Sequence, residues 1–265
     1  MGRTRLINGG AGVLMGLAIA YTGICEDVWA FGFSVEPARV ELAIPAGKRR
    51  GKTVTVRNAR SDASIHLTIY SRDVAYLPDG TNEFPAPGST AWSCASWIQA
   101  VPQELDLAPG ESHDVRVSVA VPADASGGRY AMLFFETTPS YTEKGIGVNF
   151  RVGALVEVVV PQTQRPQMKL TDLSLTESGG VRVELLNEGN VLVRPSGTLK
   201  VFDANGKPIR HAALNPSRLG VLPMTSRAFL IALDRPFPPG RYRFKVEIDY
   251  GTRTLLVGEL PVEVQ

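Results

Sequence analysis

The sequence predicts an all-β fold: two tandem immunoglobulin-like β-sandwich domains after a cleaved signal peptide. Apolar and polar residues alternate with a period of two along most of the chain, as in strands with one buried face. Proline and glycine turns separate these runs at intervals of about 8–12 residues, which is typical of antiparallel sandwiches. No stretch keeps a helical period for more than a turn or two. These observations favour packed antiparallel sheets over a helical fold.

The first thirty residues predict an export signal. Two arginines near the start precede an uncharged, largely apolar run over 11–25, which is shorter than the ~20 residues of a membrane span. Val28 and Ala30 occupy the small-residue positions for a Sec-type signal peptidase cleavage after Ala30. A lipoprotein acylated at Cys25 is the alternative, but Ile24 stands where a small residue is required. We therefore expect a signal peptide over 1–30 and a periplasmic or secreted protein.

The exported chain, residues 31–265, suffices for one large or two ordinary domains of about 100–150 residues. The net charge of +2 argues against a dedicated nucleic-acid binder, which concentrates far more positive charge. No run after the signal is long and apolar enough for stable membrane insertion. Cys94 is the only cysteine after the signal. We expect either a buried thiol between Trp92 and Trp97 or an intermolecular disulfide.

Alternating runs predict the strands in chain order. The four valines of HDVRVSVAV, for example, share one face, and the polar residues between them share the other. The predicted strands of the first half are 40–44, 53–57, 65–71, 113–121, 128–137 and 148–160. Those of the second half are 170–175, 181–186, 198–202, 227–233, 242–250 and 254–262.

An internal repeat predicts two domains. Gly-Arg-Tyr ends at Tyr130 and again at Tyr242, 112 residues later, close to the ~100 residues of an immunoglobulin-like unit. Each copy opens a predicted strand, so we expect a tyrosine corner in both, with the hydroxyl bonded back to nearby backbone. Two prolines frame the polar stretch 161–166, which cannot continue a strand ladder. We therefore predict domains over 31–162 and 163–265.

Groups that could catalyse a reaction or hold a metal are sparse. The three histidines, His66, His113 and His211, show no metal-binding spacing. The sequence has no nucleophile elbow, CxxC pair, EF-hand or phosphate-binding glycine motif. We therefore expect no catalytic residue, no metal and no cofactor. The alternatives are an all-β glycosidase whose two acids lie far apart in sequence, and a carbohydrate-binding module.

Two segments invite a functional interpretation. The basic run 48–52 joins two predicted strands, and is either a solvated hairpin or a contact for an acidic polymer or lipid headgroups. Strand 148–160 carries seven apolar residues on one face and spans about 23 Å, longer than most strands. Core burial accounts for most of them, but at a sheet edge part of the row would pair with a strand of another chain.

Several segments together resemble a known family. SVEPARVEL, GKTVTVRNARSDASIHLTIYSRD, WIQAVPQELDLAPGES and VNFRVGALVEVVVP resemble the N-terminal domain of PapD-like periplasmic pilus-assembly chaperones. They are similar also to a related domain of bacterial surface proteins. NEGNVLVRPSGTLKVFDANGKPI resembles a segment of the second immunoglobulin-like domain of such proteins. The resemblance implies that the partners are protein subunits of a surface fibre or other envelope proteins.

In the pilus chaperones, an arginine early in domain one and a lysine late in its last strand anchor a subunit's carboxy-terminus. That last strand also lends apolar residues to the subunit's sheet. Arg39 matches the arginine by local pattern, whereas Val156 stands where the lysine is expected. Arg151 is the only cation of the strand, and an Arg39–Arg151 pair would need a bulge to bind a carboxylate. The implied partner-binding residues are Arg39, Val148, Phe150, Arg151, Val152 and Ala154.

The leading hypothesis is thus an exported, chaperone-like protein that docks fibre subunits by strand-edge pairing and is not an enzyme. The alternative is a structural or adhesive cell-envelope protein on the same fold, without donor-strand activity.

Overall fold

The computed structural model describes residues 32–77, 80–138, 149–233 and 237–264. The predicted signal peptide and Val148 lie outside these residues. The described strands fall into two groups, which we name the first unit (33–159) and the second unit (168–264), and helix is limited to one short 3-10 turn. The all-β prediction is therefore confirmed. The boundary between 162 and 163 stays a prediction, within the stretch that separates the two groups.

The first unit contains two facing sheets, of strand order β1-β3-β9-β7 and β2-β11-β10-β4-β8. A small hairpin, β5-β6, and the 3-10 turn η1 lie beside them. The bounds are β1 Phe33–Glu36, β2 Arg39–Ala43, β3 Arg49–Asn58, β4 Ile65–Arg72, β5 Ala75–Tyr76, β6 Asn82–Glu83, η1 Ala95–Trp97, β7 Ile98–Val101, β8 Glu104–Leu107, β9 Ser112–Ala120, β10 Gly128–Thr137 and β11 Arg151–Val159.

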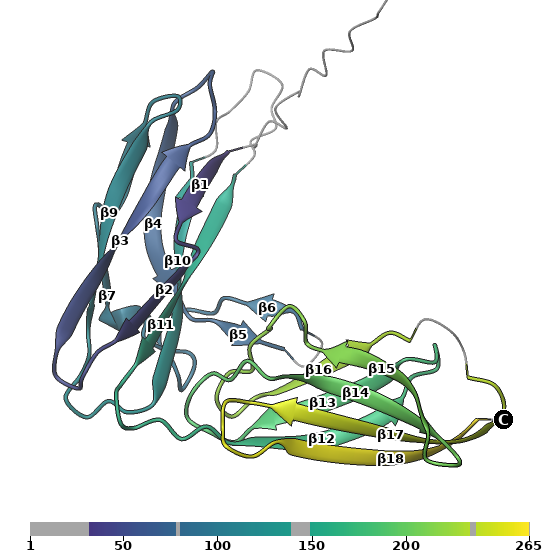
Figure 1. Cartoon of the computed structure of the whole chain (residues 1–265). Helices are drawn as coiled ribbons and strands as arrows, with labels where there is room; N and C mark the ends of the chain where they lie inside the picture. Colours follow the sequence, from purple (N-terminus) through teal and green to yellow (C-terminus); the bar gives the residue numbers. More distant parts are fainter. Residues whose placement is uncertain (1–31, 78–79, 139–148, 234–236, 265) are drawn as a thin grey trace, which may run out of the picture.

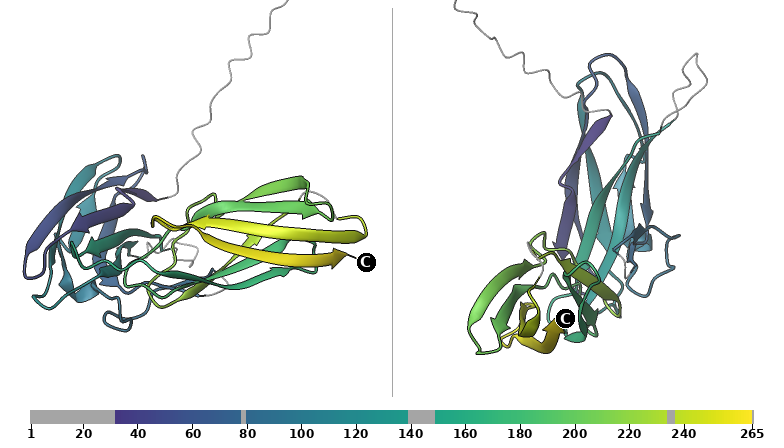
Figure 2. Two further views of the ribbon diagram at one scale, coloured as in Figure 1. Left: turned by 60° about the horizontal axis from the view of Figure 1, so that its bottom comes forward. Right: turned by 90° about the vertical axis from the view of Figure 1, so that its right-hand side faces the viewer.

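The second unit contains a three-stranded sheet, β12-β13-β16, and a four-stranded sheet, β15-β14-β17-β18. The bounds are β12 Met168–Leu175, β13 Val181–Asn187, β14 Ser196–Asp203, β15 Pro208–Leu214, β16 Ser226–Ile231, β17 Gly240–Asp249 and β18 Leu256–Val264. Each unit has its own buried apolar core, formed by the alternating residues of its strands. Figures 1 and 2 show the two units meeting at an angle, so that the chain is bent.

Some strands could not be found from alternation. The four-residue strands β1, β7 and β8 are too short for a period to show, and β15 has mainly exposed or half-buried residues because it lies at a sheet edge. The basic run was placed wrongly: Arg49–Lys52 form the start of β3 and not a connecting hairpin. They continue the pairing of β3 with β9, which the local sequence does not reveal.

The chain changes sheets between β1 and β2. β1 pairs with β3 over Thr55–Asn58, and β2 pairs with β11 over Leu155–Val159 in the opposite sheet. Each pairing covers only half of the longer strand. In the described part of the chain, two stretches therefore have no strand hydrogen-bonded to them on one side: Arg49–Val54, which we name the β3 edge, and Arg151–Ala154, which we name the β11 edge.

No helix among the described residues is long and apolar enough to cross a membrane.

Candidate functional site

The β11 edge exposes backbone hydrogen-bonding groups. The Leu155 amide donates to the Ala38 carbonyl at 3.0 Å, so odd-numbered residues of β11 turn their backbone groups toward β2. Even-numbered residues turn theirs toward β10, as the Phe150 carbonyl shows by accepting the Thr137 amide at 2.9 Å. Arg151 and Gly153 lie before the point where β2 starts to pair with β11. Their N–H and C=O groups hence point to a side where no described strand pairs with them.

The inner face of this edge is apolar. Phe150 and Val152 are half-buried and pack at the margin of the first core, while Ala154 is fully buried. The Phe150 ring lies beside Gly32, where an added Cβ would come within 3.4 Å of its Cγ atom. Three of the predicted apolar residues therefore follow one another along the inner face of the edge.

The outer face carries Arg151 over an aromatic group. The guanidinium carbon of Arg151 lies 4.5 Å from the ring centroid of Phe134 and 5.9 Å from that of Phe84. Phe134 and Met132 lie over Gly153, where a Cβ would come within 2.9 Å of both side chains. Arg151 is therefore held against an apolar surface by cation–π contact, and no carboxylate of the described residues forms an ion pair with it.

Arg39 lies at the start of β2 but does not join Arg151. Arg39 stands opposite Leu155, four residues from Arg151, which corresponds to about 13 Å along the strand. The pairings of β11 are continuous, so the bulge that an Arg39–Arg151 pair requires is absent from them. Val156, which stands where the resemblance places a lysine, faces the buried core.

Arg39 instead contacts Glu157, a residue that the sequence reasoning missed. Arg39 Nε lies 3.1 Å from Glu157 Oε1, and Arg194 of the second unit donates to the same oxygen. The Glu157 side chain is only 8% exposed, so two guanidinium groups neutralise a nearly buried carboxylate. The available signal was that Glu157 is the only acid in the valine-rich strand. Its partner from the second unit could not be read from the sequence.

Tyr130 also joins the two units, which corrects one prediction. Its hydroxyl accepts a hydrogen bond from the Leu192 amide at 2.5 Å, so it does not form the predicted tyrosine corner. Burial among Val74 and Leu222 raises the pKa of Tyr130 to about 12. Tyr242 behaves as expected, since its hydroxyl donates to the Pro238 carbonyl at 2.9 Å.

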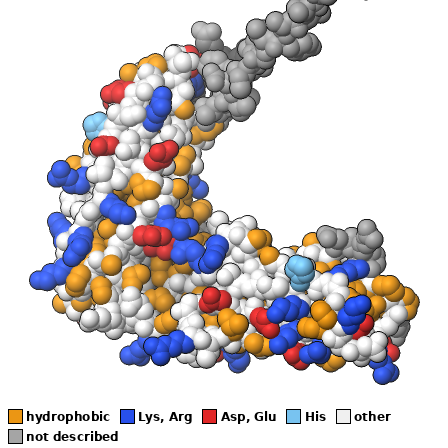
Figure 3. Space-filling view, in the orientation of Figure 1, with side chains coloured by type: hydrophobic (Ala, Val, Ile, Leu, Met, Phe, Trp, Pro, Cys, Tyr) orange, Lys and Arg blue, Asp and Glu red, His pale blue; other side chains and the backbone are white. Residues whose placement is uncertain are grey.

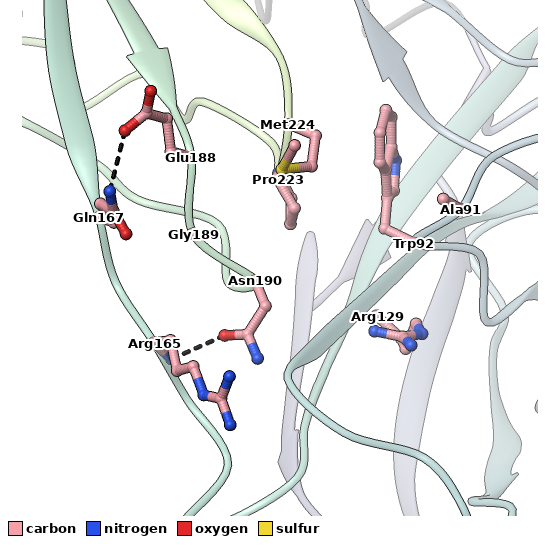
Figure 4. A pocket seen from close by; sticks show the side chains of 10 residues that line it. All are labelled: Ala91, Trp92, Arg129, Arg165, Gln167, Glu188, Gly189, Asn190, Pro223 and Met224. Carbon is pink, nitrogen blue, oxygen red and sulfur yellow. Dashed lines mark hydrogen bonds between the residues drawn. The ribbon is translucent and has the colours of Figure 1, made fainter.

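Two hollows flank this junction. One, of about 530 Å³, is lined by Tyr130, Glu157 and Arg194 among others, and Figure 3 shows acidic and basic side chains gathered where the units meet. The other, of about 400 Å³, lies between Trp92 of the first unit and Met224 of the second (Figure 4). Both hollows are thus built from residues of both units.

Potential metal ligands of the described residues do not form a cluster. No group of three or more His, Cys, Asp or Glu residues among those described could hold a metal ion. Cys94 is fully buried in the first core, and this burial raises the pKa of its thiol. His66 Nδ1 lies 2.8 Å from Asp106 Oδ1 on an exposed strand pair. The described residues thus offer surfaces and a strand edge.

No family model and no curated protein matches the chain. Among solved structures, it is similar to the class 5 fimbrial chaperone CfaA, with 16% identity and a TM-score of 0.50. It is also similar to a chain of the chaperone–tip adhesin complex of CFA/I fimbriae biogenesis, with 15% identity and a TM-score of 0.51. Each match covers 86% of this chain and 98% of the other. At this identity the similarity is one of fold, and the fold of two β-sandwich domains implied by the resemblance is confirmed.

Proposed function

We propose that this chain is an exported, periplasmic binding protein of the chaperone type that docks protein subunits of a surface fibre at the β11 edge. The observation that carries the proposal is the unpaired backbone of Arg151 and Gly153 beside the half-buried Phe150 and Val152. An extended segment of a subunit would bond to these backbone groups and pack apolar side chains against the inner face. Binding by strand addition needs no catalytic group.

The fold supports this proposal. The two similar structures are of fimbrial chaperones, and one of them was solved with a tip adhesin. The partner class that we propose for this chain is therefore a fibre subunit with an incomplete sheet.

Arg39 is not part of the proposed contact. Its guanidinium group already lies against Glu157 and, at 3.4 Å, against Glu41. A carboxylate arriving from a partner would compete with both acids. The proposal thus rests on backbone pairing and apolar packing, without anchoring of a terminal carboxylate.

The test removes one backbone hydrogen-bond donor of the β11 edge. Arg151→Pro removes an N–H from the open side of β11 while leaving the hydrogen bonds to β10 in place, because proline is tolerated where the amide faces solvent. Arg151→Ala is the matched control, since it removes the same side chain and keeps the N–H. Small exported proteins encoded beside this gene would be co-expressed with each variant, and their soluble, co-purifying yield measured.

We expect the native chain and Arg151→Ala to keep a subunit soluble, and Arg151→Pro to reduce the recovered complex at least about tenfold. Equal recovery with all three variants would contradict strand-edge pairing. A chain that stabilises none of these proteins and fractionates with envelope material would instead support the structural or adhesive alternative.

A further inference from the structure

Five exposed cations of the first unit lie at or just before the start of β3 and on the part of β9 that pairs with it. They are Lys48, Arg49, Arg50, Lys52 and Arg116, which we name the basic face. Among the described residues, no carboxylate lies within ion-pair distance of any of them. The strand register places Arg116 opposite Thr53 and Arg49 opposite Ala120, so Arg49 and Arg116 project from the same outer face of one sheet. Arg50 and Lys52 alternate with Arg49 and extend from the other side of the β3 edge, where they are exposed.

The backbone beneath these cations is held firmly. The Lys48 amide donates to the Pro45 carbonyl at 3.1 Å, and the Lys48 carbonyl accepts the Val121 amide at 2.9 Å. The residues between the cations on this face are small, with Gly51 and Ser118 directly paired. The positive charges therefore stand on hydrogen-bonded backbone with small residues between them.

Several outward-facing cations of the second unit are paired with carboxylates. Lys200 Nζ lies 2.6 Å from Glu247, and Lys245 Nζ lies 3.2 Å from the same residue. Arg243 lies 3.2 Å from Glu259. Exposed cations of the second unit that form no ion pair with a described carboxylate, such as Lys169, Lys207 and Arg218, stand far apart in the sequence, whereas four of the five cations of the basic face lie within 48–52.

The basic face lies on the side of the first unit that points away from the second unit, and Figure 3 shows basic side chains along that margin. Its sheet is the one opposite β11. Val101, which is 55% exposed, stands opposite Arg116 and adds an apolar contact beside the cations. A flat surface in contact with this face would leave the β11 edge free.

We propose that the basic face binds an anionic lipid bilayer. Charge complementarity selects a negatively charged partner, and cations carried on two neighbouring strands suit a surface of many headgroups better than a single inserted chain. Each basic residue near an anionic bilayer raises partitioning by about fivefold. This binding does not depend on the proposed docking of subunits.

The test compares two triple variants of the exported, detergent-free protein. Lys48→Gln/Arg49→Gln/Arg116→Gln neutralises three cations of the basic face. Arg241→Gln/Arg243→Gln/Lys245→Gln removes the same charge from ion-paired positions of the second unit. Each protein is sedimented with vesicles of phosphatidylcholine alone and of phosphatidylcholine with phosphatidylglycerol, at about 0.1 M and about 1 M salt. Thermal unfolding shows that both variants remain folded.

We expect the native chain to bind only the anionic vesicles, and to be released by high salt. The first variant should bind about 100-fold more weakly, and the second less than about fivefold more weakly. Equal losses in the two variants, equal binding to neutral vesicles, or no vesicle binding would overturn the proposal. Retention on heparin without vesicle binding would also overturn it, in favour of an acidic polymer.

Discussion

The two open edges of the first unit arise from one event but differ in their side chains. When the chain passes from β1 to β2, it leaves half of β3 and half of β11 without a neighbour. The β3 edge carries Arg49, Arg50 and Lys52, all exposed, and charges of this kind discourage pairing with another strand. The β11 edge has Phe150 and Val152 on its inner face. Strand pairing thus creates both edges, and side chains decide which one is available to a partner.

The largest effect is expected from giving the β11 edge a charge. Val152→Asp places a carboxylate at the margin of the core, where a docked strand would desolvate it, and should weaken subunit binding about 100-fold. Thr53→Asp adds the same charge to the β3 edge and should leave binding unchanged. Titration of a purified subunit measures both, and equal losses would show that the two edges do not differ in function.

The converse change should make the β3 edge available for pairing with another strand. Arg50→Val with Lys52→Val gives the β3 edge an apolar row like that of β11, so we expect self-association at least about tenfold stronger than in the native chain. Arg50→Gln with Lys52→Gln removes the charges without adding apolar surface. Sedimentation velocity measures the self-association of both double variants. A monomeric valine variant would contradict the view that Arg50 and Lys52 prevent strand pairing at the β3 edge.

A smaller effect is expected from a change at the junction between the two units than from a change at the β11 edge. Tyr130→Phe leaves the half-buried Leu192 without an acceptor for its amide and should lower the free energy of unfolding by about 1–3 kcal/mol. The matched change Tyr242→Phe removes a more exposed hydrogen bond and should cost less. Urea unfolding measures both. Subunit binding to the β11 edge should persist in each variant if the edge acts through its own backbone.

The same tyrosine predicts a pH dependence. The folded-state pKa of Tyr130 is raised to about 12, above the value of about 10 in the unfolded chain. The unfolded state therefore loses this proton first, and stability falls as the pH rises from about 10 to about 12, by about 2–3 kcal/mol in total. Tyr130→Phe should show a shallower loss across this range in urea unfolding. A slope equal to that of the native chain would contradict the assignment.

The smallest effect is expected from Arg151→Ala. Its cation–π contact with Phe134 is partly exposed, so its loss should lower the free energy of unfolding by less than about 1 kcal/mol. Chemical denaturation gives this value. A larger loss would mean that Arg151 supports the fold of the edge as well as covering it.

Much of the fold could be predicted from alternation. β10 begins and ends at Gly128 and Thr137 as predicted, and Arg151 lies on the face opposite Phe150 as expected. The candidate site was less accessible. SVEPARVEL contains two short strands that pair in different sheets, and alternation cannot show where a strand changes partner. The role of Glu157 was missed, and the hydrogen bond of Tyr130 was wrongly predicted, for a related reason. Their partners Arg194 and Leu192 belong to the other unit.

The sequence by itself determined which side chains of each strand face inward, because a strand turns successive residues to opposite faces whatever its neighbours are. It also determined the all-β class and the repeated unit. Only the tertiary structure decided which strands are neighbours, where the β3 and β11 edges lie open, and which charges meet between the units. The physical reason is that strands pair through backbone groups common to every residue, so the pairing depends on packing of the whole unit and not on local sequence.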